Sequence, residues 1–250
     1  MRFTLAATCL LAQLVISAAV WAEQRVTATD LERGTTSQRL SALATVLDVS
    51  PDRRDAAIWS ALEGEAKRML GVLRRRKPGD TDQSDVESAY AAGIVRALTQ
   101  KNDIRLISIF VDYSGIVSYA TQALIAFGDS AVPAILTAEQ AATNDLNQKG
   151  GVTNALAELV KNDHALSERS LDSIENWVES LKVRNSKLEM DEVVNLASIA
   201  LLCRRPDLRA EVERLVGERD AWTSHGVTDS FEISFGQRIL RAKLTAAPQS

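Results

Sequence analysis

The residues best suited to chemistry are few and widely separated in this sequence. The 250-residue chain holds two histidines, His164 and His225, and two cysteines, Cys9 and Cys203. A structural zinc site takes about four nitrogen or sulfur ligands at short spacings such as Cys-x-x-Cys or His-x-x-x-His. No such spacing occurs. We therefore predict no metal site built from these residues.

Two further patterns lack the features that a ligand would need. The acidic run Asp80-x-Asp82-x-x-Asp85 has three carboxylates but lacks the following glycine and the closing glutamate of a calcium-binding loop. The pair Gly150-Gly151 stands at the expected start of a helix and follows no strand, unlike a phosphate-binding loop. A Gly-x-Ser-x-Gly nucleophile motif is absent. The sequence thus predicts no cofactor and no catalytic residues, and it leaves the binding residues unassigned.

An enzyme, or an accessory subunit of one, remains the alternative hypothesis. Its site would be assembled from scattered residues of suitable type, namely Asp112, Tyr113, His164 and His225. Nucleophilic catalysis would need Cys203 or a serine to meet a histidine and an orienting acid. Near helix ends and in loops, however, such residues more commonly cap, pack or contact solvent.

Cys203 follows the apolar run Ile199-Ala200-Leu201-Leu202, which we expect to be part of a well-covered helix at 190–202. We therefore expect a buried, unreactive thiol that is dispensable for function. The neighbouring Arg204 and Arg205 argue the other way, because cations lower the pKa of a thiol. Adjacent helical positions point about 100° apart, so these cations need not reach the sulfur.

Residues 1–22 have the features of a secretory signal peptide. Arg2 supplies the positive charge at the N-terminus, and residues 5–20 are mostly apolar. Residues of small or moderate size precede the expected cleavage point after Ala22. An uncleaved anchor is the alternative, but the run is short for a membrane span of about 20 residues. Cys9 lies inside the apolar core and not in a lipid box. We expect cleavage, export to the periplasm or the medium, and no membrane span in the mature protein.

The charge balance argues against nucleic acid as a partner. The net charge is −4, and no basic stripe is interleaved with aromatic residues. The one basic run, Arg74-Arg75-Arg76-Lys77, is followed by Pro78-Gly79 and is typical of a helix C-terminus, where the macrodipole favours cations. Hydrophobic residues make up 46% of the chain, as in an ordinary folded domain.

Apolar residues at helical spacing run through most of the chain and predict an all-α fold. The C-terminal segment could also form a strand, but the spacing of Phe231, Phe235, Ile239 and Ala242 favours a helix. We expect a polar linker at 23–36, one repeat-like helical domain at 37–245 and a tail at 246–250. The expected helices are 40–47, 50–77, 84–98, 102–111, 116–127, 131–142, 152–160, 166–181, 190–202, 206–215 and 231–242.

A tight joint between two helices is predicted around Gly128. Glycine can adopt the left-handed conformation that ends a helix. Asp129 or Ser130 could accept hydrogen bonds from the free N–H groups of the next helix. Pro133 lies in the first turn of that helix, where a missing N–H costs little.

The residues around this joint resemble the junction of HEAT repeats, especially the short bacterial variety. The pattern is Ala123-Leu124-x-x-Phe127-Gly128-x-x-Ala131-Val132-Pro133-x-Ile135. Weaker forms occur at Ala155-Leu156-x-x-Leu159 and at Ala200-Leu201-Leu202, with unequal spacings inside the range of about 20 to 50 residues that repeats show. The resemblance implies antiparallel helix pairs stacked as an α-solenoid, with scaffolding, peptide-binding or occasionally cofactor-binding roles. It transfers no functional residue to this chain.

These observations favour an exported binding or scaffold protein that presents a helical groove to a protein or peptide. Such arrays work by presenting surface and imply no chemistry. The enzyme described above and a structural role in the cell envelope are the other two hypotheses. A solvent-exposed groove of aromatic and charged residues would favour binding, whereas His164 or His225 buried beside a carboxylate in a pocket would favour the enzyme.

Overall fold

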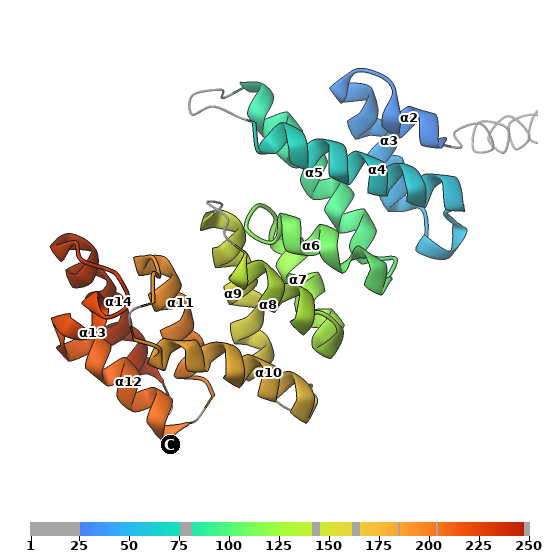
Figure 1. Ribbon diagram of the computed structural model, residues 1–250. Helices are drawn as coiled ribbons and strands as arrows, with labels where there is room; N and C mark the ends of the chain where they lie inside the picture. The colour runs from blue at the N-terminus through green and yellow to red at the C-terminus, as the bar shows by residue number, and fades with distance from the viewer. Residues whose placement is uncertain are drawn as a thin grey trace, which may run out of the picture. The chain divides into compact units, whose positions relative to one another are not determined.

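The computed structural model describes residues 26–75, 82–141, 146–161, 166–184, 186–203 and 205–247. Every regular element in these ranges is a helix, which confirms the all-α class (Figure 1). The chain divides into two compact units, Met1–Lys101 and Asn102–Ser250, where the sequence suggested a single domain at 37–245. No helix in the described ranges is long and apolar enough to cross a membrane.

The first unit consists, in its described part, of two helical hairpins. Within each hairpin the two helices pack together, and each hairpin also packs on the other through α2 with α4 and α3 with α5. A short 3-10 turn, η1 (Pro51–Arg53), precedes α4, which begins after the N-cap residue Asp55. The helices are α2 (Ala28–Glu32), α3 (Thr36–Asp48), α4 (Ala56–Leu73) and α5 (Asp82–Thr99).

The prediction of a polar linker at 23–36 is wrong for the part that forms α2. Thr27 and Asp30 make a capping box at the start of α2. Leu31 is completely buried, and its carbonyl accepts a hydrogen bond of 3.0 Å from the hydroxyl of Tyr90 in α5. The segment has a single core residue, too few to give a helical period. Its packing against α3 and α4 therefore decides its structure.

A buried carboxylate ties three helices of this unit together. Glu65 of α4 is 4% exposed and binds Arg68 through two contacts of 2.7 Å. Arg39 of α3 lies 3.7 Å from the same carboxylate, and the hydroxyl of Tyr90 donates to it at 3.2 Å. Burial and the charge of Glu65 raise the pKa of Tyr90, so this phenol stays protonated and keeps donating.

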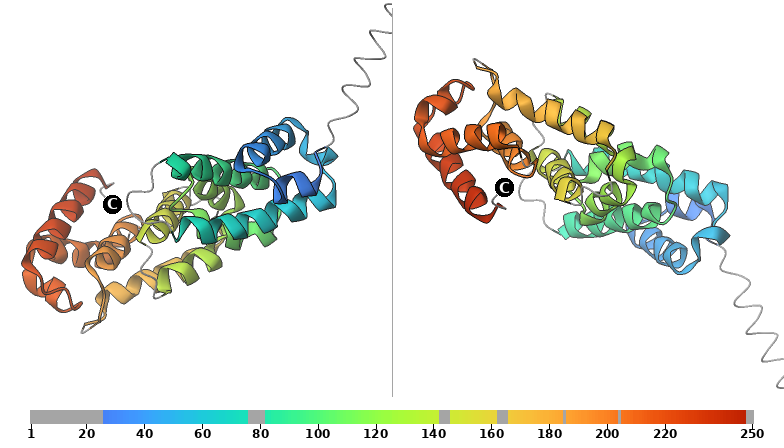
Figure 2. Two further views of the ribbon diagram at one scale, coloured as in Figure 1. Left: turned by 90° about the horizontal axis from the view of Figure 1, so that it is seen from above. Right: turned by 90° about the horizontal axis from the view of Figure 1, so that it is seen from below.

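The second unit contains the longer series of helices. Figures 1 and 2 show them following one another in chain order across the unit, from α6 and α7 at one end to α13 and α14 at the other. The elements are η2 (Ile104–Leu106), α6 (Ile107–Tyr113), α7 (Ser118–Phe127), η3 (Gly128–Ser130), α8 (Val132–Gln140), α9 (Leu146–Lys161), α10 (Glu168–Val178), η5 (Glu179–Lys182), α11 (Met190–Ala200), α12 (Pro206–Gly217), α13 (Arg219–Thr223) and α14 (Ser230–Ala246).

In the second unit the helices pair into hairpins, and successive hairpins pack on one another. Helices pair as α6 with α7, α8 with α9, α10 with α11, and α12 with α14. The first members of these pairs also pack in order, α6 on α8 and α8 on α10, and η5, which continues α10, packs on α12. The second members do the same, α7 on α9, α9 on α11 and α11 on α14. Each hairpin thus packs on the next through both of its helices.

The Ala-Leu pairs of the sequence lie on the second members of three successive hairpins. Ala123-Leu124 is in α7 and Ala155-Leu156 is in α9, whereas Ala200-Leu201 is at the end of α11. All six side chains are buried. Each pair precedes the passage to the first helix of the next hairpin. The three segments therefore occupy corresponding places in the fold, despite their unequal spacing in the sequence.

The joint between α7 and α8 confirms the prediction for Gly128. This residue ends α7 with a φ of 54°, and α8 follows after η3 with Pro133 in its first turn. The predicted cap is wrong, however, because Ala131 precedes α8 and supplies no side-chain cap. Asp129 instead accepts a hydrogen bond of 2.8 Å from the backbone N–H of Ser167, the N-cap of α10. Asp129 thus links one hairpin to the next.

Two predicted helix starts are also wrong. Ser84 and Asp85 lie inside α5, which begins at Asp82. Ser50 precedes only the 3-10 turn η1, so α4 starts later than expected. Ile104 is 63% exposed, because η2 turns it outward while Leu106 enters the core.

The C-terminal segment is helical as predicted, but the apolar residues whose spacing indicated the helix do not form its buried face. Phe231 of α14 is 76% exposed, while Ile233, Gly236 and Leu240 are buried. The reason is the indole of Trp222, which occupies the space beside Gly236. A Cβ atom added at Gly236 would lie 2.2 Å from this ring. Close packing on a glycine therefore sets the rotation of α14 about its axis.

The positive φ of Gly128 leads to a prediction about the stability of the folded protein. Substitution Gly128→Val should lower the free energy of unfolding by about 1–2 kcal/mol, because a β-branched residue is strained at this φ. Gly64→Val in α4 is the matched control. A Cβ atom at position 64 meets nothing within 4 Å, and glycine and valine differ little in helix propensity. Urea denaturation measures both. An equal decrease in the free energy of unfolding in the two variants would contradict the positive φ assigned to Gly128.

Candidate binding site

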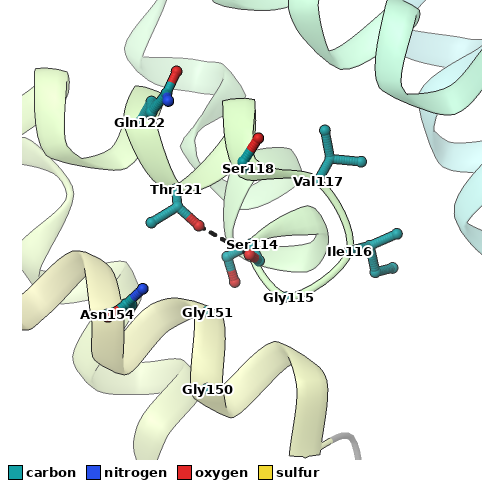
Figure 3. A pocket seen from close by; sticks show the side chains of 10 residues that line it. All are labelled: Ser114, Gly115, Ile116, Val117, Ser118, Thr121, Gln122, Gly150, Gly151 and Asn154. Carbon is teal, nitrogen blue, oxygen red and sulfur yellow. Dashed lines mark hydrogen bonds between the residues drawn. The ribbon is translucent and has the colours of Figure 1, made fainter. Parts of the chain in front are cut away.

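An open pocket lies in the second unit between α7, α9 and the connection from α6 to α7 (Figure 3). Its volume is about 580 Å³. Its lining carries hydroxyl and amide groups, three glycines and two aliphatic side chains, but no charged group and no aromatic ring. The lining residues are Ser114, Gly115, Ile116, Val117, Ser118, Thr121, Gln122, Gly150, Gly151 and Asn154.

The absence of a side chain at Gly151 shapes the pocket. A Cβ atom there would lie 2.2 Å from the carbonyl carbon of Ser114 and 2.4 Å from the backbone nitrogen of Gly115. Helix α9 can therefore approach the connection between α6 and α7 only with glycine at this position. The hydroxyl of Thr121 donates to the carbonyl of Ser114 at 2.9 Å and fixes that connection against α7.

Two primary amides at the pocket are available to a ligand. Gln122 of α7 and Asn154 of α9 are both exposed, and neither side chain makes a hydrogen bond within the described residues. Each amide offers a donor and an acceptor. At Gly150, one turn before Asn154, an added Cβ would meet nothing within 4 Å. The pocket can thus exchange neutral hydrogen bonds with a ligand.

The sequence predicts Gly150-Gly151 at the start of a helix and outside any phosphate loop, but the pair lies inside α9, which begins at Leu146. Gln122 and Asn154 were not identified as site residues. The one signal that could have indicated them is that each stands immediately before a buried Ala-Leu pair.

Of the two histidines in the enzyme hypothesis, the structure describes one, His225, which is buried in the second unit. His225 is 0% exposed, and its Nδ1 lies 2.8 Å from Oγ of Ser186. Its Nε2 is also buried and has no hydrogen-bond partner within the described residues. Burial, and to a smaller extent the charge of Arg184, lower the pKa of His225, so the ring is neutral near pH 7.

This arrangement does not match a catalytic serine and histidine. In such sites one ring nitrogen acts on the serine while a carboxylate orients the other. Within the described residues no carboxylate accepts a hydrogen bond from the His225 ring, since Nδ1 meets Ser186 and Nε2 has no partner. Glu211 of α12 is bound by Arg184 at 2.9 and 3.1 Å. Arg214 binds the same carboxylate at 2.9 Å. Ser186 and His225 therefore act as a packing contact between two connections of the unit.

The remaining residues of the enzyme hypothesis do not join His225. Asp112 and Tyr113 lie in the last turn of α6, where Tyr113 is buried, and neither bonds the His225 ring. His164 lies outside the described residues, as does Asp80 of the acidic run. Asp82 and Asp85 both lie within α5. The described residues contain no cluster of three or more potential metal ligands.

Cys203 lies in the turn after α11, since that helix ends at Ala200 and not at Leu202 as predicted. Its side chain is half-buried. Burial and the charge of Glu175 raise the pKa of the thiol to about 12, against an opposing effect of Arg205. The thiol is therefore protonated at neutral pH, unlike the thiolate of a reactive cysteine.

Comparison with known proteins assigns this chain to no family. No protein-family model matches the sequence, and neither the curated proteins nor the solved structures provide a significant match. The site must therefore be interpreted from its own geometry.

Alanine substitutions at Gly150 and Gly151 of α9 should change the stability of the protein in opposite directions. Gly151→Ala should lower the free energy of unfolding by at least about 2 kcal/mol, because the new methyl group overlaps the backbone of Ser114. Gly150→Ala should raise it by about 0.5–1 kcal/mol, because alanine is the better helix former and its methyl group enters open space. Denaturant unfolding distinguishes them. Two changes of the same sign would contradict the packing described for α9.

The buried imidazole predicts how stability depends on pH. The pKa of His225 is lowered in the folded protein, whereas the unfolded chain titrates near pH 6.5. Below about pH 6.5 the unfolded state binds a proton that the folded state does not, so stability falls with falling pH by up to about 1.4 kcal/mol per unit. Replacement His225→Gln should remove this contribution. Equal pH slopes for the wild type and the variant between pH 7 and 5 would refute it.

Proposed function

We propose that this protein is an exported binding or scaffold protein that uses the surface of its second helices to hold a protein or peptide partner. The observation that carries the proposal is the pocket between α7 and α9, with two amides that make no hydrogen bond within the described residues. Its uncharged lining suits neutral polypeptide and gives no site for a phosphate backbone.

A HEAT-like α-solenoid is the architecture that we propose for the chain. The packing of each hairpin on the next through both of its helices supports it, as does the corresponding placement of the three Ala-Leu segments. Repeats that contact only their neighbours create extended surfaces, and binding to those surfaces is their usual use.

Export and the lack of catalysis belong to the same proposal. The apolar run after Arg2 supports a signal peptide that is cleaved after Ala22. A binding role without catalysis is supported by the neutral His225, which has no orienting carboxylate, and by the protonated thiol of Cys203. These two groups were the strongest candidates for chemistry in the sequence.

The test is affinity capture from the extracellular or periplasmic fraction of the source cells with a variant that fills the pocket. Gly150→Arg places a long charged side chain in open space, so it should block the pocket and leave the fold intact. Gly64→Arg is the matched control, because Gly64 is also an exposed helical glycine whose added Cβ meets nothing within 4 Å.

We expect the wild type and Gly64→Arg to retain the same partner and Gly150→Arg to lose it by at least about tenfold, as for the loss of 1.4 kcal/mol of binding energy. N-terminal sequencing of the exported protein should begin at Glu23. If the wild type retains nothing that a column without protein does not also retain, the binding function is wrong. If Gly150→Arg retains the partner fully, the pocket is not its site.

A further inference from the structure

Helix α14 has a second apolar face, on the side away from its packing partners. The helix packs on α11 and α12, and it buries Ile233, Gly236 and Leu240. Because each residue turns a helix by about 100°, five other apolar side chains fall within about 80° of arc on the opposite side. We call these five residues the outer stripe: Phe231, Phe235, Ile239, Ala242 and Ala246.

The outer stripe is open to solvent along the length of α14. Phe231 is 76% exposed, more than any other large hydrophobic side chain of the described chain. Its ring stacks on that of Phe235, with the ring centroids 6.2 Å apart. Ala242 is exposed, and Phe235 and Ile239 are half-buried. Helix α14 lies at the end of the second unit opposite α6 and α7 (Figure 2), where a stacked array normally has a polar outer face. An apolar stripe in this place indicates an interaction surface.

Three cations border the outer stripe, and they have no acidic partner in the described structure. Arg238 and Arg241 lie on one side of the stripe and Lys243 lies on the other. The guanidinium carbon of Arg238 is 5.1 Å from the centroid of the Phe235 ring. None of the three cations makes an ion pair within the described residues. In α12, by contrast, both arginines pair with glutamates of their own helix.

Helix α14 is basic, although the chain as a whole is acidic. It holds three cations and one acid, Glu232, whereas the whole chain has a net charge of −4. Glu232 lies in the first turn, where the helix dipole favours a carboxylate. The rest of α14 therefore carries positive charge only. Charge complementarity requires that whatever covers the outer stripe be anionic.

We propose that the outer stripe of α14 binds the surface of an anionic phospholipid bilayer. A helix that lies in the plane of such a surface buries its apolar face at the boundary between headgroups and acyl chains. Phe231 and Phe235 supply the rings that enter this boundary. Arginine and lysine have long apolar stems that let their charges reach the lipid phosphates, as Arg238, Arg241 and Lys243 would do here.

This inference goes beyond the proposed function and does not depend on it. Helix α14 contributes none of the ten residues that line the pocket. Binding at the bilayer surface also requires no helix that spans the membrane. The pocket and the outer stripe are thus separate surfaces of the second unit.

Charge and shape favour a bilayer over a protein as the occupant. A second copy of the chain laid on the outer stripe would place two sets of three cations against one another. An acidic partner helix would need a groove, which takes apolar residues from more than one helix, whereas the outer stripe belongs to α14 alone. A bilayer is fluid and can cover the ridge of a single helix without a preformed complementary shape.

The test is co-sedimentation of the full chain with vesicles of phosphatidylcholine and phosphatidylglycerol, mixed about three to one. Vesicles of phosphatidylcholine alone are the neutral comparison. We expect binding to the anionic vesicles to be tighter by at least about tenfold, because each cation near an anionic surface contributes about fivefold at low salt. Added salt should weaken this binding, because it screens the attraction.

Two substitutions with matched controls test the residues of α14. Phe231→Ser should weaken binding to the anionic vesicles by about tenfold or more, because the large ring no longer leaves water. Ile104→Ser is its control, since Ile104 is also a large side chain of the second unit and is 63% exposed. Lys243→Gln should weaken binding about fivefold. Lys67→Gln in α4 is its control, because Lys67 is exposed, makes no ion pair within the described residues and gives the same change in net charge.

A second measurement locates α14 at the bilayer whatever the N-terminal residues do. Phe231→Trp adds a fluorophore to the outer stripe, and Ile104→Trp adds one to η2. Anionic vesicles with brominated acyl chains quench a tryptophan that enters the bilayer. We expect the added fluorescence to be quenched in Phe231→Trp and to be unchanged in Ile104→Trp.

Each result decides the inference. Equal binding to neutral and anionic vesicles, equal effects of a substitution and its control, or no quenching in Phe231→Trp would overturn it. A wild type that is dimeric without vesicles, with a monomeric Phe231→Ser, would identify a second copy as the occupant and refute the bilayer. An acidic protein captured by the wild type and lost on Phe231→Ser, without vesicle binding, would likewise refute it. Gly150→Arg should bind vesicles as the wild type does, so failure of the proposed function and failure of this inference are distinguishable.

Discussion

The second unit depends on the backbone contact between α9 and the connection from α6 to α7. At Gly151 a single added methyl group would overlap the carbonyl of Ser114, so the two hairpins meet with no side chain between them. This approach brings α7 and α9 together as neighbours. It also leaves Gln122 and Asn154 on the two sides of one pocket. Packing and the candidate binding surface thus have the same origin.

Each unit contains a buried carboxylate that two arginines approach. Glu65 binds Arg68 and lies near Arg39, and Glu211 binds Arg184 and Arg214, so each acid belongs to a compact group of opposite charges. A buried ion pair contributes little net stability, but removal of one partner leaves a desolvated charge and is costly. The Glu65 group therefore helps to specify which helices of the first unit meet.

Each unit also buries a polar side chain that no carboxylate binds within the described residues. In the first unit the guanidinium of Arg54 donates to the carbonyl of Val49 at the end of α3 and to that of Ala97 in the last turn of α5. In the second unit His225 keeps one nitrogen without a hydrogen bond in the described structure. A buried polar atom without a partner is costly, and a neutral ring limits that cost. This is consistent with a group whose role is to pack.

The sequence by itself determined the helical class and the joint at Gly128, because helical periodicity and a left-handed glycine are properties of neighbouring residues. It also located the Ala-Leu segments, though not their corresponding places in the hairpins. Only the tertiary structure decided that α2 folds around Leu31, that Trp222 turns Phe231 of α14 outward, that Ser186 meets His225, and that Gln122 and Asn154 line the same pocket. Each of these depends on contacts between segments distant along the chain, and local spacing carries no information about such contacts.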